Sequence, residues 1–161
     1  MISAVHESPL GQLTLVSDGM GLTGIYFPVH KGGPKGLPRA GEDAIVSQAR
    51  RELDSYFAGR REHFEIAVRP QGTPFQIRVW SLLLGIKYGH TESYGALAHA
   101  LGNPNASRAV GAAVGRNPIS IIVPCHRVIG VAGALTGFAG GVERKRALLA
   151  LEAGETALLS T

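Results

Sequence analysis

A break at residues 69–72 divides the chain into two parts whose hydrophobic patterns differ. Before the break, short apolar runs alternate with turn signals, a pattern that predicts strands; after it, apolar residues recur at helical spacing. Arg69-Pro70-Gln71-Gly72 predicts a linker, and Thr73-Pro74-Phe75-Gln76 directly behind it has the capping residue, proline and glutamine that begin a helix. We therefore expect one domain over residues 1–69 and a second over 73–161.

The first part predicts a small sheet with one covering helix. Its apolar runs are separated by Ser8-Pro9-Leu10-Gly11 and by Asp18-Gly19, which are typical turn sequences. A helical pattern follows over residues 45–57, and Gly59 is placed to end it. Strands are expected at residues 2–6, 13–16, 22–27 and 63–68.

The second part predicts a set of short helices. Ser93 is placed to cap one of them, Gly102-Asn103 turns the chain, and Gly154 ends the last one. Two short helices joined by a tight turn are typical of a helix-turn-helix, although any helical hairpin gives the same pattern. Helices are expected at residues 74–86, 93–101, 104–115 and 141–153.

The composition excludes several classes of protein. Hydrophobic residues make up 45% of the chain and charged residues 17%, a balance that supports a packed core and argues against disorder. No apolar run approaches the roughly 20 residues of a membrane span, and Met1 to Val5 lacks the basic start of a secretory signal. One cysteine forms neither an internal disulfide nor a multi-thiolate zinc site, so we expect a cytoplasmic protein without a metal.

The net charge of +4 lies entirely in the second part of the chain. Residues 73–161 carry eight Lys and Arg against four Asp and Glu, whereas residues 1–72 carry eight of each kind. Such asymmetry indicates a polyanion as partner for the second part. An ordinary solvated surface accounts for it equally well.

Cys125 stands in a setting that favours chemistry over packing. A lone cysteine is more often a small buried hydrophobe. Here an apolar run at 119–123 leads to Pro124-Cys125-His126-Arg127, which would be unusual packing material. Cationic neighbours favour the thiolate, which is the nucleophilic form of the side chain. Cys125 is therefore the candidate nucleophile.

Glu152 is the second unusual residue. It follows Leu148 by four positions, so it borders the apolar stripe of the last helix, and it lies in the final turn, where the helix dipole disfavours an anion. A carboxylate in that place needs a partner, and an imidazole is a natural one; the alternatives are a side chain that snorkels to water or a pair with Arg144 or Arg146. Asn117, directly before Pro118, fits a simple turn residue as well as a functional one.

The run from Pro124 to Ile129 resembles the active-site signature of the O6-alkylguanine-DNA alkyltransferases, also called methylated-DNA–protein-cysteine methyltransferases. The likeness covers residues 73–153 and is looser in the first half. It implies an α/β, ribonuclease-H-like N-terminal domain and a mostly α-helical, winged-helix-like C-terminal domain that binds DNA. Further motifs fall in the family's order and spacing: Gly102-Asn103-Pro104, Ser107 to Gly111, Asn117-Pro118, Gly140-Gly141 and Leu148 to Glu152.

The resemblance implies roles in one irreversible transfer, with no cofactor. Cys125 would take the alkyl group from O6-alkylguanine and keep it, and His126 would remove the thiol proton through a water molecule. Glu152 would orient His126, and Asn117 would hold the turn that presents the cysteine. Tyr94 would hydrogen-bond the target guanine. Activity on O4-alkylthymine is a further candidate.

The resemblance also implies how the protein binds double-stranded DNA. A monomer that does not bind membranes is expected. Arg108 would enter the space left by the flipped nucleotide, and the small residues of its helix would press on the minor groove. Phe138 stands where many relatives have tyrosine, and the N-terminal half has no cysteine of the kind that binds zinc in some relatives. The implied DNA contacts are Ala106, Ser107, Arg108, Ala109, Gly111 and Arg127, and the implied alkyl pocket is Val128, Phe138 and Ala139.

Two other functions share some of these residues. A cysteine hydrolase would use Cys125, His126 and Glu152, but adjacent residues on an extended chain point to opposite faces, which would strain a direct contact between cysteine and histidine. It would also turn over, whereas an alkyltransferase stops after one event. A DNA-binding module of the alkyltransferase-like kind would lack the acceptor cysteine, which this chain has.

Overall fold

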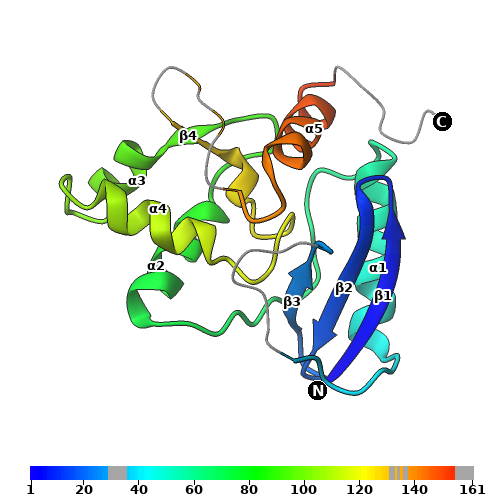
Figure 1. Cartoon of the computed structure of the whole chain (residues 1–161). Coiled ribbons are helices and arrows are strands. Elements are labelled where there is room, and N and C mark those ends of the chain that lie inside the picture. The colour runs from blue at the N-terminus through cyan, green and yellow to red at the C-terminus, as the bar shows by residue number, and fades with distance from the viewer. Residues whose placement is uncertain (29–35, 131–132, 134, 136–137, 155–161) are drawn as a thin grey trace.

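The N-terminal part is an antiparallel sheet with a helix packed against it (Figure 1). Strands β1 (Ile2–Ser8), β2 (Gly11–Ser17) and β3 (Leu22–Tyr26) pair in that order, and α1 (Ala44–Phe57) contacts all three. The predicted meander and covering helix are therefore confirmed. The computed structural model describes residues 1–28, 36–130, 133, 135 and 138–154.

Local signals set both ends of α1. The Asp43 carboxylate accepts a hydrogen bond from the backbone N–H of Val46 at 2.8 Å, which satisfies one of the free donors of the first turn. Gly59 has a φ of 74°, a left-handed conformation that glycine adopts without a steric cost. Between these ends, the apolar face of the helix packs against the sheet, with Val46, Leu53 and Tyr56 buried.

The strand predicted at residues 63–68 is wrong. Only Val68 pairs with the sheet, in an isolated parallel bridge to Leu22. The backbone N–H groups of Glu65 and Ile66 donate instead to the carboxylate of Glu52 on α1, at 2.8 and 3.2 Å. A side chain distant in sequence thus takes the hydrogen bonds that a strand would have needed.

The C-terminal part is helical, as predicted (Figure 1). The segments β4 and β5, which the sequence did not predict, form a short parallel pair, and α3 and α4 pack together as a helical hairpin. The elements are α2 (Pro74–Leu83), β4 (Glu92–Ser93), α3 (Tyr94–Ala100), α4 (Ser107–Gly115), the 3-10 helix η1 (Cys125–Arg127), β5 (Val128–Ile129) and α5 (Val142–Glu152).

Two helix limits differ from the prediction. The capping box at Thr73 and Gln76 begins α2 as expected, but the helix ends at Leu83, three residues early. Pro104 does not begin α4, which starts at Ser107. The Ala106 N–H donates to the carbonyl of Asn103 at 3.0 Å, so the intervening residues form a turn.

The two parts share one hydrophobic core and meet along β3 and α5. The Ile25 N–H donates to the carbonyl of Pro118 at 2.9 Å, which adds the segment ahead of η1 to the edge of the sheet. Phe27 packs edge-on against Phe138, with ring centroids 5.8 Å apart. Arg144 of α5 donates to the carbonyl of Leu10 at 2.8 Å. The N-terminal part therefore supports the region around Cys125 directly.

Candidate active site

The segment between α4 and η1 is a compact turn held by Asn117. The buried Asn117 amide donates to the carbonyl of Val123 at 2.8 Å and accepts from the backbone N–H of Ile119 at 3.0 Å. Ile121 has a φ of 75°, a left-handed conformation that is costly for a β-branched residue. The side chain of Asn117 thus holds a strained turn directly ahead of Cys125.

Cys125 opens η1 and is only 3% exposed. Burial raises the pKa of its thiol to about 11, although a hydrogen bond with Asn117 and the positive charge of Lys145 oppose that shift. The expectation that cationic neighbours would favour the thiolate is therefore wrong: burial dominates, and the resting side chain is a protonated thiol. A reaction at sulfur needs a group that takes this proton.

His126 lies beside Cys125, fully buried. Its Nε2 is 2.7 Å from Oε2 of Glu152. Burial lowers the pKa of His126, although the carboxylate opposes this, so the ring is neutral at neutral pH. An ionised carboxylate only accepts hydrogen bonds, so Nε2 carries the proton and Nδ1 keeps a free lone pair. Within the described part of the chain, Nδ1 has no hydrogen-bond partner.

Glu152, the last residue of α5, is buried and ionised. Burial alone would raise the pKa of its carboxyl, but hydrogen bonds from His126, Arg127 and Tyr56 outweigh this effect and lower the pKa to about 2. Its unusual position on the helix has the expected explanation, a buried partner. That partner is His126 together with Arg127, and not Arg144 or Arg146, the alternatives that the sequence left open.

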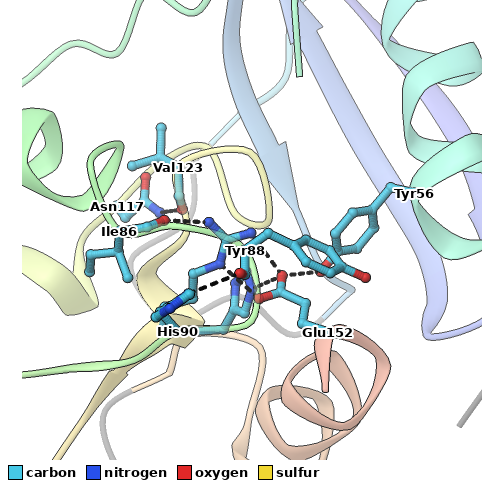
Figure 2. A network of polar contacts seen from close by, with 9 residues as sticks. Tyr56, Ile86, Tyr88, His90, Asn117, Val123 and Glu152 are labelled. Carbon is cyan, nitrogen blue, oxygen red and sulfur yellow. Dashed lines mark hydrogen bonds and ion pairs between the residues drawn. The ribbon is translucent and has the colours of Figure 1, made fainter. Parts of the chain in front are cut away.

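Arg127 is committed to this carboxylate, so the prediction that it contacts DNA phosphates is wrong. Its Nε and Nη2 donate to the two oxygens of Glu152 at 2.8 and 3.0 Å, and its Nη1 donates to the carbonyl of Ile86 at 2.6 Å. Figure 2 labels these two acceptor residues, Glu152 and Ile86. Its guanidinium carbon lies 5.7 Å from the centre of the Tyr88 ring. With 7% of its surface exposed, it has no access to a phosphate.

Two buried residues of the site escaped the sequence analysis. Lys145 donates to the carbonyl of Val128 at 2.5 Å, and Tyr56 on α1 donates to Oε2 of Glu152 at 2.6 Å. A signal for Lys145 exists, since it precedes Leu148 by three positions on the buried face of α5. Tyr56 carried no such signal, because it belongs to the ordinary apolar stripe of its helix.

The helical hairpin places Tyr94 and Arg108 on neighbouring helices. Ser93 caps α3, accepting from the N–H of Ala96 at 3.0 Å, and Tyr94 follows it directly. The Tyr94 ring lies against α4 at Gly111, where an added Cβ would come within 3.7 Å of the ring. The open face of α4 consists of small residues around one arginine: Ser107, Arg108, Ala109, Gly111 and Ala112 are exposed or half-buried, and Ala106 ahead of them is half-buried.

The three residues expected at the alkyl pocket occupy different settings. The backbone N–H of Val128 donates to the carbonyl of Cys125, so Val128 follows the cysteine within one turn. Phe138 is buried against the N-terminal part through Phe27, and Ala139 is half-buried beside it. The structure thus ties Val128 to the cysteine directly and Phe138 to β3.

Among residues 1–28, 36–130, 133, 135 and 138–154, no three His, Cys, Asp or Glu side chains gather closely enough to hold a metal ion. In the same part of the chain, no helix combines the length and apolar character of a membrane span.

Comparison with known proteins identifies this arrangement. Residues 1–70 match the family model described as "6-O-methylguanine DNA methyltransferase, ribonuclease-like domain", and residues 74–154 match the corresponding "DNA binding domain". The chain is 49% identical over 146 residues to a methylated-DNA–protein-cysteine methyltransferase of Mycobacterium tuberculosis, covering 91% of this chain and 88% of that protein. It is 47% identical to the one of Methanosarcina acetivorans, covering 94% and 98%.

Solved structures agree with the sequence matches. The Mycobacterium tuberculosis OGT in complex with DNA superposes with a TM-score of 0.88 at 46% identity, over 97% of this chain and 95% of that one. An O6-methylguanine-DNA methyltransferase from Pyrococcus kodakaraensis superposes with a TM-score of 0.60 at 25% identity, over 94% and 99%. The chain therefore belongs to the 6-O-methylguanine DNA methyltransferase family, whose members repair DNA by transferring an alkyl group to a protein cysteine.

Proposed function

We propose that Cys125 accepts the alkyl group of O6-alkylguanine and that His126 removes the thiol proton through a water molecule. The state of His126 carries this proposal: it is buried beside the thiol, Glu152 holds its Nε2, and its Nδ1 has no partner within the described residues. A neutral imidazole with one free lone pair can act as a general base, because that lone pair can accept a proton. The protonated Cys125 thiol supplies that proton.

The proposed reaction balances without a cofactor. The thiol proton passes to Nδ1 of His126 through the water, and the sulfur lone pair forms a bond to the alkyl carbon. The carbon–O6 bond breaks, and its electron pair stays on the guanine, which leaves as an anion. Tyr94 and the backbone N–H near Ala139 are the proposed donors toward that charge, because donors aimed at developing charge lower the barrier. The thioether product retains no leaving group for water to displace.

Excess substrate tests this function. We expect transfer to stop when one equivalent of alkyl group per protein has been consumed, because Cys125 is the only cysteine and its product is stable. Methyl loss from a duplex containing O6-methylguanine, followed over hours at tenfold excess, measures the stoichiometry. A cysteine hydrolase would continue linearly. The sequence argument against a hydrolase assumed that Cys125 and His126 lie on an extended chain, where a direct contact between them would be strained. They lie in a 3-10 turn instead, so that argument no longer applies and the stoichiometry has to distinguish the two functions.

DNA is proposed to bind along the open face of α4 in its minor groove. Small residues let the helix backbone approach the DNA closely, and Arg108 is proposed to fill the stack when the damaged base is flipped toward Cys125. Ala106, Ser107, Ala109 and Gly111 would make the neighbouring contacts, which is supported by their place at the open face of α4, where Ala109 is exposed and the other three are half-buried.

The remaining proposals concern the whole chain. We propose domain limits at 1–69 and 73–161, with a ribonuclease-H-like first domain and a winged-helix-like second domain. The family matches over residues 1–70 and 74–154 support the division into two parts, and residues 155–161 lie outside the described residues. Val128, Phe138 and Ala139 are proposed to line the alkyl pocket, and O4-alkylthymine is a further candidate substrate. We also propose a cytoplasmic monomer that needs no metal, in keeping with its single cysteine.

Arg108→Ala should slow the repair of duplex DNA on the order of tenfold and leave the reaction with free O6-benzylguanine almost unchanged, because only a duplex base must be flipped. Single-turnover rates on both substrates measure this. Arg116→Ala, which removes another exposed arginine at the end of α4, is the matched control. At a saturating concentration of duplex, it should slow repair much less than Arg108→Ala does. Equal slowing on both substrates would place Arg108 in the chemical step or in folding.

The alkylated protein should melt at a lower temperature than the free protein. The sulfur is almost completely buried, and adding methylenes to a packed site costs about 1–3 kcal/mol. For a domain of this size, we expect a fall in Tm of roughly 2–4 °C per kcal/mol. Thermal unfolding after stoichiometric methylation and after benzylation measures it, with the larger fall for benzyl. An unchanged Tm would show that the pocket around Cys125 is loose.

A further inference from the structure

The carboxylate of Glu152 receives hydrogen bonds from both parts of the molecule. His126 and Arg127 donate from η1, and the Tyr56 hydroxyl donates from α1, 96 positions earlier in the chain. Figure 2 shows the side chain of Tyr56 reaching the carboxylate of Glu152 from a different element. We infer that Tyr56 is a positioning residue for alkyl transfer, which acts through Glu152 to set the orientation and the proton affinity of His126.

The surroundings of Tyr56 fix its hydroxyl in one place. The side chain is fully buried, and its ring packs against Phe57, Phe64 and Tyr88, with centroids 5.4, 5.3 and 6.2 Å away. Burial, followed by the negative charge of Glu152, raises the pKa of Tyr56 well above its ordinary value. The hydroxyl is therefore protonated throughout the working pH range and always acts as a donor.

Tyr56 and His126 share one oxygen atom. The hydroxyl lies 2.6 Å and Nε2 of His126 lies 2.7 Å from Oε2 of Glu152. A donor at this oxygen withdraws part of its negative charge, so it weakens the attraction between the carboxylate and a proton on the imidazole. It also restricts the rotation of the carboxylate that aligns the ring. Removing the hydroxyl should loosen the alignment and make His126 easier to protonate.

Tyr56 comes from the N-terminal part, whereas the other neighbours of His126 described below come from the C-terminal part. Beside the ring lie Cys125 and the guanidinium of Arg127, which opposes its protonation, as does the ammonium of Lys145 from α5. Tyr88, from the segment after α2, lies behind Arg127. Among the described residues, the charged and titratable groups that act on His126 or its carboxylate include Cys125, Arg127, Lys145, Glu152, Tyr56 and Tyr88, and His90 and Arg146 line a pocket beside Glu152.

The inference rests on the roles proposed for His126 and Glu152, and Tyr56→Phe tests it. Phenylalanine keeps the ring packing and removes only the hydroxyl. We expect single-turnover transfer from free O6-benzylguanine to slow about tenfold at neutral pH. The acidic limb of the rate–pH profile should also move to higher pH, because His126 then holds its proton more tightly. A merely structural role would slow the reaction and leave that limb in place.

Tyr26→Phe is the matched control. Tyr26 is a half-buried tyrosine of the same part of the chain, on β3, and it lines a separate cavity with Met1, Thr23 and Pro38. This variant should react within twofold of the unmodified protein and keep its pH profile. If neither the unmodified protein nor this control transfers the alkyl group, the proposed function fails; if both transfer it and Tyr56→Phe matches them, only the inference about Tyr56 fails.

A readout without turnover completes the test. NMR titration of the His126 ring in the unreacted protein, assigned with the variant His126→Gln, should give a higher midpoint in Tyr56→Phe than in the unmodified protein. Thermal melting identifies a variant that fails to fold, and in that case the titration of Tyr56→Leu, which also lacks a donor and does not overfill the buried site, replaces it. A slower reaction with an unchanged His126 midpoint would overturn the inference.

Discussion

Replacing Cys125 with serine should reduce alkyl transfer by roughly a thousandfold or more, because a neutral alcohol is far less acidic and less nucleophilic than a thiol. The site makes this loss severe. Burial already raises the pKa of the thiol to about 11, and the same burial would disfavour an alkoxide still more strongly. Single-turnover assays with a methylated duplex and with free O6-benzylguanine measure the loss.

Binding to DNA is the control for this variant. The open face of α4 belongs to a different element from η1, so the affinity of Cys125→Ser for undamaged duplex should equal that of the unmodified protein. Fluorescence anisotropy at fixed salt measures it, because phosphate contacts make DNA affinity depend on ionic strength. Transfer by the serine variant at a rate near that of the unmodified protein would exclude Cys125 as the acceptor.

Replacing Glu152 with alanine should destabilise the fold by about 3–5 kcal/mol, because it leaves the buried guanidinium of Arg127 without its carboxylate. His126 and Tyr56 lose their acceptor in the same step. For a chain of this size, the expected fall in Tm is roughly 6–20 °C. Urea unfolding and thermal melting measure the two quantities.

Glu143→Ala on the same helix is the matched control. Its side chain is 86% exposed and, among the described residues, pairs with the exposed Arg146, so the free energy of unfolding should change by less than about 1 kcal/mol. Equal stability of the two variants would contradict a buried carboxylate that holds η1 and α5 together.

The stability that Glu152 contributes should also depend on pH. Its pKa in the folded protein is about 2, below the ordinary value of 4.5. The contribution is therefore fully present above pH 4.5 and is lost as the pH falls toward 2. In the unmodified protein, acid should weaken the fold over this interval. Glu152→Ala should lose part of that dependence, whereas Glu143→Ala should keep it.

Local signals in the sequence predicted much of the fold. Ser93 and the Thr73–Gln76 box each cap a helix, and the glycines at 59 and 154 have the positive φ values expected beyond a helix end. These signals act through near neighbours in the chain, so one sequence is enough to read them. The three-strand meander followed in the same way from turns between alternating runs.

The errors arose where a distant partner decides the structure. Residues 63–68 have a strand pattern, but Glu52 on α1 takes two of their N–H groups. Arg127 was expected among the DNA contacts, but it is buried against Glu152, 25 positions away. Tyr56 contacts the same carboxylate across 96 positions. No local pattern encodes such pairs, which depend on how α1, η1 and α5 pack.

Both local signals and distant partners determine the site around Cys125. A carboxylate in the last turn of an apolar helix indicated a buried partner for Glu152, and the structure provides two. The setting of Cys125 indicated reactivity, but burial makes the resting group a thiol and not a thiolate. The resemblance already implied His126 as the base, and the three-dimensional surroundings add the reason that a base is needed, which is the burial of the thiol.

The central claim is that Cys125 keeps the alkyl group, and peptide mass spectrometry tests it most directly. After incubation with a duplex containing one O6-methylguanine, the intact protein should gain the mass of one methyl group. The peptide that contains Cys125 should carry all of it, at one equivalent per protein. A methyl group on any other residue, no added mass despite repaired DNA, or repair beyond one equivalent would contradict the account.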